Sequence, residues 1–443
     1  MSHILSTPVT ALTAIKRQLS QARPGATTVI TAYAVLLYVI PSDRRVEALG
    51  GAGSLASLLA TAALLWWGWH QLNVAGTRSR QRIQWVRVSA FTLFGACLLS
   101  YAGSALLPLP SADVSVSDLG LLRIAALIGI LLVAHDGIDT EEDLLLLARR
   151  LCLLGSLYAG LGLVQFFAGT SLVDSIQLPG LTSSPDAGVG ARNGFVRPVS
   201  TAVHPLEYSV VLTMLLPLAL TLAVHEVNRS LLRRWTPVVV LVTATALSVT
   251  RSALLATLVV FLVLLPSWPR ATRALLTLAA AAGSLALYLV VPGMASTILA
   301  MFTQEDASVT SRTNSYDSAL SFWSISPIFG RGFGTLLPAY RIFDNQYLLS
   351  AVEIGLTGLL ALLFLIITAM VAPLRGRSQW QRQPMRGIGT ALFASVLAGG
   401  LILAFFDAFA FSQASGTLFM MVGLCGAYCN LTGDVRPLVL EER

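Results

Sequence analysis

The sequence predicts an all-α, polytopic membrane protein, and three observations lead to that fold class. Of 443 residues, 55% are hydrophobic and only 12% are charged, whereas soluble domains carry about 25% charged residues. The apolar residues form runs of roughly 20, the length that crosses a bilayer as a helix. Most Lys and Arg residues fall between these runs, in alternate loops. We therefore expect a single integral membrane domain over residues 1–443.

About twelve transmembrane helices are expected from these runs. The predicted spans cover residues 27–41, 49–70, 88–107, 118–134, 148–168, 205–225, 235–249, 252–267, 273–291, 346–371, 387–406 and 410–431.

The seventh and eighth spans come from one apolar run, 237–265, which is interrupted only at 250–252. Either one long helix with a buried Arg251 or two short helices fits this run. Three arginines precede it at 229–234, and two follow it at 270–273. Cytoplasmic loops are enriched in Lys and Arg, so both flanks should lie on the same side. This requires two short helices that meet at Arg251 on the opposite face.

The same rule orients the whole chain. It places both termini in the cytoplasm and two long loops, 169–204 and 292–345, outside. The net charge of +7 then reflects topology, so we expect no nucleic-acid partner. The four cysteines lie within apolar runs, which indicates neither a disulfide framework nor a metal site.

Several charged residues stand at the expected outer face. Arg197, His204 and Glu207 precede or begin the sixth span, Arg251 lies between two short helices, and Arg312 lies in the second long loop. Arginines that converge from separate segments would bind a diphosphate, because the guanidinium forks onto phosphate oxygens. Pairing of each arginine with a carboxylate or a lipid headgroup stays open, as does a loop-ordering hydrogen bond from His204.

The second long loop ends in Asp344 and Asn345, directly before an apolar helix that contains Glu353. Asp344 either caps this helix or acts as a general base on a sugar hydroxyl. The glycines at 330–334 indicate a tight turn rather than a nucleotide loop, because no strand precedes them.

Four segments share features with one family. They are an Arg, Thr and His-Pro segment at 196–220, a Thr-Arg-Ser segment at 248–261, an Arg, Pro and Gly-x-Gly-x-Gly segment at 311–335, and a helix with Glu-x-Gly-x-x-Gly at 344–360. In this order they resemble the O-antigen ligase and O-antigen polymerase (Wzy-type) membrane glycosyltransferases.

The resemblance implies a GT-C-like fold in the bacterial inner membrane and an active site that faces the periplasm or outside. It implies inverting transfer of a glycan from a polyprenyl diphosphate to an acceptor hydroxyl on a glycan or glycolipid, without a metal or cofactor. Other polysaccharide-assembly proteins are expected partners besides the lipid bilayer.

The resemblance also assigns roles to residues by position. Arg197, Arg251 and Arg312 would bind the donor diphosphate, and Asp344 with Asn345 would be catalytic. The residues expected to support the site are Arg192, His204, Glu207, Arg331, Tyr340, Arg341 and Glu353.

One departure from the family leaves the acceptor open. Many ligases carry His-Asn where this chain has Asp344-Asn345, so a polymerase or a ligase for another surface glycan fits as well as a lipid A core ligase. Two other classes remain alternatives, namely a lipid-linked glycan flippase or other transporter and a non-catalytic assembly scaffold.

Overall fold

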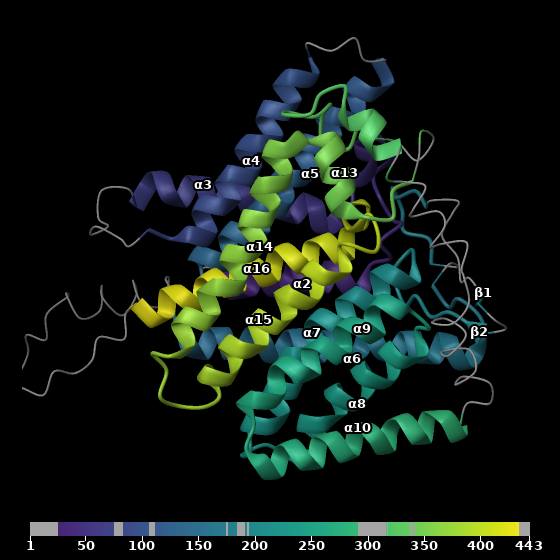
Figure 1. The fold of residues 1–443 in the computed structure, drawn as a ribbon, viewed down its shortest axis with the longest axis vertical. Helices are drawn as coiled ribbons and strands as arrows, with labels where there is room; N and C mark the ends of the chain where they lie inside the picture. Colours follow the sequence, from purple (N-terminus) through teal and green to yellow (C-terminus); the bar gives the residue numbers. More distant parts are fainter. Residues whose placement is uncertain are drawn as a thin grey trace, which may run out of the picture.

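The computed structural model describes residues 25–74, 83–105, 111–173, 176–183, 191–192, 195–290, 316, 318–336, 340 and 342–433, and these are mainly helical (Figure 1). The long helices are α2 (Ala26–Val39), α3 (Leu55–Val74), α4 (Trp85–Ser104), α5 (Ser111–Asp136), α6 (Glu141–Ala168), α7 (Pro205–His225), α8 (Leu231–Leu247), α9 (Arg251–Leu264), α10 (Arg270–Val290), α13 (Gln346–Glu353), α14 (Gly355–Arg377), α15 (Met385–Ile402) and α16 (Ser412–Gly433). Short 3₁₀ helices cover Glu47–Ala52, Leu265–Ser267 and Ala408–Ala410. A short antiparallel pair joins β1 (Ala191–Arg192) to β2 (Phe195–Val196).

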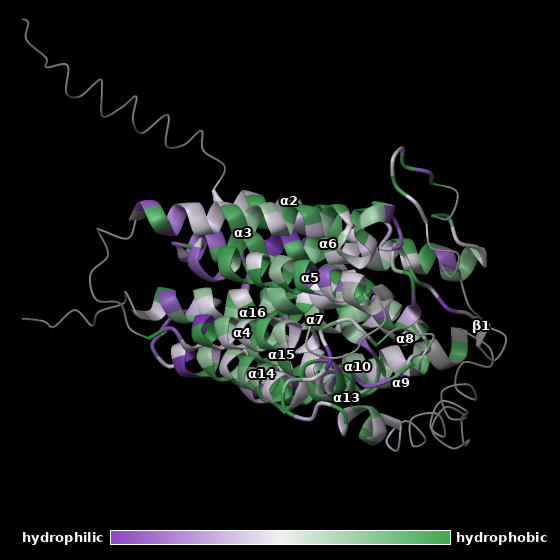
Figure 2. Cartoon of the chain, turned by 90° about the horizontal axis from the view of Figure 1, so that it is seen from above, coloured by the Kyte–Doolittle hydropathy of each residue, from purple (hydrophilic) through white to green (hydrophobic). Residues whose placement is uncertain are grey.

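Helices α7 and α16 form the centre of the bundle. In each of these two helices, 89% of the most apolar 18-residue stretch is buried inside the protein. The corresponding share in α4, α6 and α14 is 39%. Helix α16 packs on α5, α14, α15 and α7, and α7 also packs on α8. The peripheral helices expose large apolar side chains such as Leu157 and Phe167 of α6, and Figure 2 shows that hydrophobic residues run along most helices. Such outward apolar faces are suited to lipid.

Seven helices of the described residues are long and apolar enough to cross a membrane: α4, α5, α6, α7, α14, α15 and α16. Two more, α2 and α9, are apolar but shorter. The predicted polytopic, all-helical membrane protein is therefore confirmed. The number of about twelve crossings and the GT-C-like arrangement stay predictions.

The break predicted within the apolar run 237–265 is confirmed. Helix α8 ends at Leu247, and α9 begins at Arg251. Between them Val249 has φ +51°, a left-handed conformation that a β-branched residue rarely adopts and that a helix cannot contain. Arg251 is consequently the first residue of a helix rather than a charge in the middle of one.

The prediction of one helix over 346–371 is wrong, because α13 ends at Glu353 and α14 begins at Gly355. Gly355 has φ +67°. The break is filled by a segment that is distant in sequence, since Leu356 N donates to Pro327 O at 2.9 Å. A Cβ atom on Gly355 would lie 2.3 Å from Ile328 O. The glycine thus permits both the turn and the close approach of this segment.

Replacing Gly355 with alanine should destabilise the protein by about 1–3 kcal/mol, because the backbone conformation is strained for an L side chain and the Cβ meets a backbone oxygen. Thermal unfolding in detergent would measure the loss. Gly283→Ala is the matched control, since Gly283 lies in α10 with no atom within 4 Å of its Cβ position. Equal unfolding temperatures for the two variants would contradict this explanation of the break.

Candidate active site

The segment 197–204, between β2 and α7, is fixed by side chains from other helices. Gln165 of α6 donates from Nε2 to Ser200 O at 2.9 Å and accepts from Ser200 N at 2.6 Å. Gln413 of α16 donates to Thr201 Oγ1 at 3.0 Å, and Thr201 Oγ1 donates to Tyr38 O of α2 at 2.7 Å. These bonds hold Ser200 in a left-handed conformation, φ +56°, and so set the position of the neighbouring arginine.

The side chain of Arg197 contacts the residue that precedes α9. Its Nη2 donates to Thr250 Oγ1 at 3.2 Å, and this hydroxyl donates to Ser248 O at 3.0 Å. Thr250 is the N-cap residue, but its side chain accepts no hydrogen bond from the first turn of α9, which contains no acidic residue. Arg251 is the first residue of the helix. Two arginines from distant segments therefore lie beside the positive end of a helix dipole, an arrangement suited to phosphate oxygens.

His204 is the N-cap of α7. Its Nδ1 accepts a hydrogen bond from Leu206 N at 3.1 Å, and its ring packs against Phe411 with centroids 6.0 Å apart. Two effects lower the pKa of His204 to about 4: burial of the ring is the larger, and the positive charge of Arg197 is the smaller. The ring is neutral near pH 7, which is the form that can accept the capping bond. The structure thus gives His204 a loop-ordering role.

Glu207 is fully buried and holds three segments together. Its Oε2 accepts from Ser42 Oγ at 2.8 Å and from Val203 N at 3.0 Å. Its Oε1 accepts from Gln413 N at 2.7 Å, at the start of α16. Both carboxylate oxygens are occupied by donors from the protein. Glu207 therefore joins the segments that contain Ser42, Val203 and Gln413.

Replacing Glu207 with glutamine should lower stability by about 1–3 kcal/mol, because an amide NH₂ would face a donor that now bonds to the carboxylate. Thermal unfolding in detergent would measure this change. Glu47→Gln provides the control, since Glu47 is exposed. An unfolding temperature unchanged in Glu207→Gln would show that the three hydrogen bonds do not hold the framework.

Glu353 anchors the glycine-rich segment 330–336. Its main-chain oxygen accepts from Arg331 N at 3.0 Å, Gly332 N at 2.9 Å and Ser100 Oγ at 2.9 Å. Its side-chain Oε1 accepts from Leu336 N at 3.2 Å. The Gly-x-Gly-x-Gly and Glu-x-Gly-x-x-Gly segments therefore form one unit, in which the glutamate at the end of α13 orders the turn that packs beside it.

Arg331 of this turn lies between two aromatic rings. Its guanidinium carbon is 5.9 Å from the centroid of Phe322 and 5.5 Å from that of Tyr340. Tyr340 is 44% exposed, so one cation–π pair stands at the protein surface. Arg331 and Tyr340 thus lie together, and Tyr340 precedes Asp344 by four residues in the chain.

Asn345, not Asp344, caps α13, which corrects the capping alternative considered for Asp344. The Asn345 side chain accepts from Tyr347 N at 2.9 Å and Leu348 N at 3.2 Å. Amide and carboxylate oxygens are about equally good caps, so the sequence alone did not separate the neighbours. Asp344 lies half-buried just before the helix, and its carboxylate does not serve the cap.

Two charged residues that were not predicted from the sequence, Asp407 and Arg123, interact electrostatically with each other. Asp407, between α15 and α16, is close enough for the charge of Asp344 to raise its pKa. Arg123 of α5 interacts most strongly with Glu353, and then with Asp407 and Glu207. Each is a single charge within an apolar stretch of sequence. That isolation is the signal that could have selected them.

Three of the expected site residues have side chains outside the described part of the structure. Arg312 and Arg341 are not described, and Arg192 is placed only as a backbone residue of β1. Whether Arg312 joins Arg197 and Arg251 is therefore a prediction.

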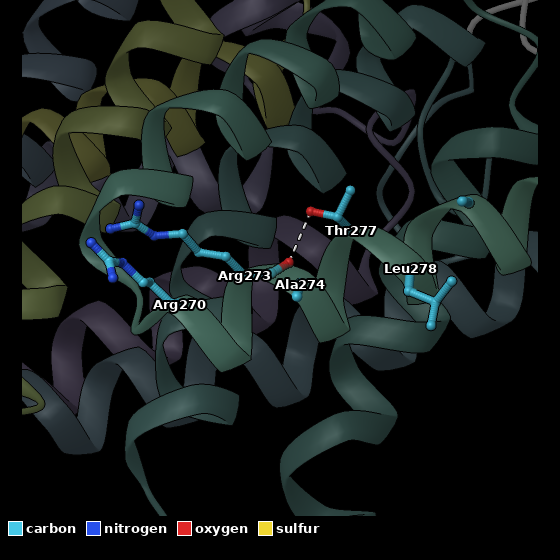
Figure 3. Close-up of a pocket in the computed structure, with 6 residues that line it drawn as sticks. Arg270, Arg273, Ala274, Thr277 and Leu278 are labelled. Atoms are coloured by element: carbon cyan, nitrogen blue, oxygen red, sulfur yellow. Dashed lines mark hydrogen bonds between the residues drawn. The ribbon is translucent and has the colours of Figure 1, made fainter.

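A cavity of about 580 Å³ lies elsewhere, along α10. It is lined by Arg270, Arg273, Ala274, Thr277, Leu278 and Ala281 (Figure 3). Arg270, the first lining residue, follows the C-terminal end of α9, and Arg251 is at the N-terminal end of that helix. At 1.5 Å per residue, the two ends of α9 are about 20 Å apart. None of its lining residues is one of the candidate site residues.

The described residues contain no group of three or more His, Cys, Asp or Glu side chains that could hold a metal ion. In a comparison with protein families, residues 236–363 match the family described as O-antigen ligase (Wzy_C). These residues include Arg251, Asp344 and Glu353. No curated protein matches the chain. The family match supports assignment to the O-antigen ligase and polymerase family and a role in making surface polysaccharide.

Proposed function

We propose that this protein transfers a glycan from a polyprenyl diphosphate carrier to the hydroxyl group of an acceptor, as a ligase or polymerase of surface polysaccharide. The observation that carries the proposal is the contact between Arg197 and the cap of α9, where Arg251 begins the helix. Thr250 and Arg251 fall within the matched residues, and Arg197 contacts Thr250 from outside them.

The donor diphosphate binds between Arg197 and Arg251, with Arg312 as the third arginine. As the bond between the anomeric carbon and the diphosphate oxygen breaks, its electron pair leaves with the diphosphate. The arginines and the positive end of the α9 dipole stabilise this negative charge. They supply the charge stabilisation that a metal ion gives in other phosphate sites, so the reaction uses neither metal nor cofactor.

The acceptor binds on the side of Asp344. Its hydroxyl proton passes to the Asp344 carboxylate while the hydroxyl oxygen attacks the anomeric carbon opposite the diphosphate. Attack from the opposite face inverts the configuration of the sugar. Asn345 holds Asp344 in place by capping α13, and Glu353 with the turn at 330–336 supports the same helix.

The protein is placed in the bacterial cytoplasmic membrane, with both termini in the cytoplasm and the site facing outward. This orientation follows from the arginines that flank the apolar helices. Arg331 and Tyr340, which contact each other, would border the acceptor side, where a glycan or glycolipid and other polysaccharide-assembly proteins would approach. Arg192 and Arg341 are expected from the sequence to support the site.

The test uses purified protein in nanodiscs with a polyprenyl diphosphate glycan, without metal, and separates the products on a gel. A ladder of longer lipid-linked glycans identifies a polymerase, and a single shift of an added acceptor identifies a ligase. Absence of transfer, together with movement of the donor across the bilayer in proteoliposomes, would replace the proposal with a flippase.

A further inference from the structure

The segment that precedes the glycine-rich turn exposes a patch of apolar side chains. Ile325, Ile328 and Phe329 are 61%, 56% and 42% exposed, and Pro327 between them is exposed as well. The sequence contains no charged residue from 318 to 329. We call residues 325–329 the apolar patch. Exposed apolar surface of this kind marks a place where a protein contacts a membrane or another protein.

The backbone of the apolar patch is hydrogen-bonded to the start of α14. Pro327 O accepts from Leu356 N at 2.9 Å. Ile328 O accepts from Thr357 N at 3.2 Å and from Thr357 Oγ1 at 2.9 Å. Proline itself has no N–H group to satisfy. Because hydrocarbon offers no hydrogen bonds, a segment that lies in lipid needs such internal partners.

The apolar patch adjoins an exposed apolar stripe of α14. This helix is long and apolar enough to cross a membrane. Leu356, Leu360 and Ile367 are exposed, and their spacing places them on one face of the helix, which has 3.6 residues per turn. Leu356 begins this stripe and is also the residue whose amide bonds to the patch. The patch therefore extends the outward face of a candidate membrane span.

Helix α4 also contacts the apolar patch, and it packs beside α14 (Figure 1). A Cβ atom on Gly103 of α4 would lie 3.7 Å from Phe329 Cβ. Leu99 lies one turn earlier on the same face of α4 and is exposed. Like α14, α4 is apolar enough to span a membrane. Three segments that are distant in sequence thus contribute to one apolar surface.

Polar groups border this surface. Tyr101, near the end of α4, donates from its hydroxyl to Asp118 at 2.7 Å, and Asp118 is exposed. Arg331 follows Phe329 by two residues, and its guanidinium carbon lies 5.5 Å from the ring centroid of Tyr340. Tyrosines are enriched where a membrane meets water. This border is consistent with a membrane surface that passes between the apolar patch and Arg331.

We propose that residues 325–329 insert among the acyl chains of the bilayer, although the sequence places them in the outer loop 292–345. Lipid is the occupant because the apolar patch adjoins two candidate membrane spans and its carbonyl groups are bonded within the protein. The inserted patch fixes the depth of the turn that follows it, in which Arg331 N and Gly332 N both donate to Glu353 O. This inference goes beyond the proposed glycan transfer and does not depend on it.

The test attaches a nitroxide spin label to Ile328→Cys and places the protein in lipid nanodiscs. Electron paramagnetic resonance then compares collisions of the label with oxygen, which concentrates in hydrocarbon, and with a water-soluble nickel chelate. Leu360→Cys is the lipid-facing reference on α14, and Glu47→Cys is the reference at an exposed charged residue. Each variant also carries Cys429→Ser, because the other three native cysteines are buried.

The ratio of oxygen to nickel collisions at Ile328→Cys should match that at Leu360→Cys and exceed that at Glu47→Cys severalfold. Phe329→Cys, a second position in the apolar patch, should give the same result and replaces Ile328→Cys if that variant does not fold. A ratio like that of Glu47→Cys would show that the patch faces water. Loss of access to both reagents would show that protein, such as a second copy of this chain, covers it. Either result would overturn the proposal, and neither requires a glycan substrate.

Discussion

Arg251→Ala should lower the rate of glycan transfer by about 100- to 1,000-fold, the usual cost of removing one preorganised group that stabilises a developing negative charge. Arg251 begins α9, and Arg197 approaches the same helix start through Thr250. The alanine variant therefore loses a guanidinium at the point where the helix dipole already favours an anion. Radiolabelled donor in nanodiscs would measure both the transfer rate and donor binding.

Two variants sharpen this result. Arg251→Lys keeps the charge but loses the two-pronged geometry, so its rate should lie between those of wild type and alanine. Arg270→Ala removes an exposed arginine beyond the other end of α9 and should transfer at the wild-type rate. Wild-type transfer by a folded Arg251→Ala protein would exclude a diphosphate site at this helix.

Asp344→Asn should lower transfer by about 100- to 10,000-fold, because the acceptor hydroxyl loses its general base. Asparagine has nearly the same shape, and the α13 cap is provided by Asn345, so the variant should fold with wild-type stability. Donor binding should stay close to wild type, since the diphosphate lies among the arginines. Transfer assays paired with thermal unfolding would separate catalysis from folding.

Asn345→Ala is the comparison that separates the two neighbouring residues. Loss of the cap should cost about 1 kcal/mol of stability and affect transfer through the position of α13. If Asp344→Asn lost stability and Asn345→Ala did not, the assignment of cap and base would be reversed. If Asp344→Asn transferred normally, the acceptor would be activated by another group.

The composition and the spacing of apolar runs were enough to predict a polytopic helical protein. The break at Arg251 could also be predicted, because the flanking arginines have to lie on the same side of the membrane. Both inferences use local sequence and the properties of a bilayer. Neither depends on which helices touch.

The break at Gly355 could not be predicted in this way. The apolar run continues through Ile354 and Gly355, and the turn exists because Pro327 and Ile328 pack into it from a distant segment. Asp407 was missed for a similar reason, since Asp344, with which it interacts electrostatically, lies more than sixty residues away. Such contacts follow from the packing of α13 against the connection after α15, which periodicity does not show.

The polar residues predicted from the sequence include some that hold the framework and others that are candidate reacting groups. Glu207, Glu353 and His204 proved to hold backbone segments in place. A buried polar side chain needs partners, and the nearest partners are often unsatisfied backbone groups at helix ends. Charge in an apolar context thus indicated where the candidate site lies but did not distinguish its framework from its reacting groups.

The central claim is that a glycan leaves its polyprenyl diphosphate at α9 and joins an acceptor hydroxyl. The most direct measurement follows both products together in EDTA-treated nanodiscs, with NMR of the new glycosidic bond. We expect equal amounts of released polyprenyl diphosphate and transferred glycan, with an inverted anomeric configuration, and a formation of both products that is about 100- to 1,000-fold slower with Arg251→Ala. A retained configuration, or transfer that stops when metal is removed, would contradict it.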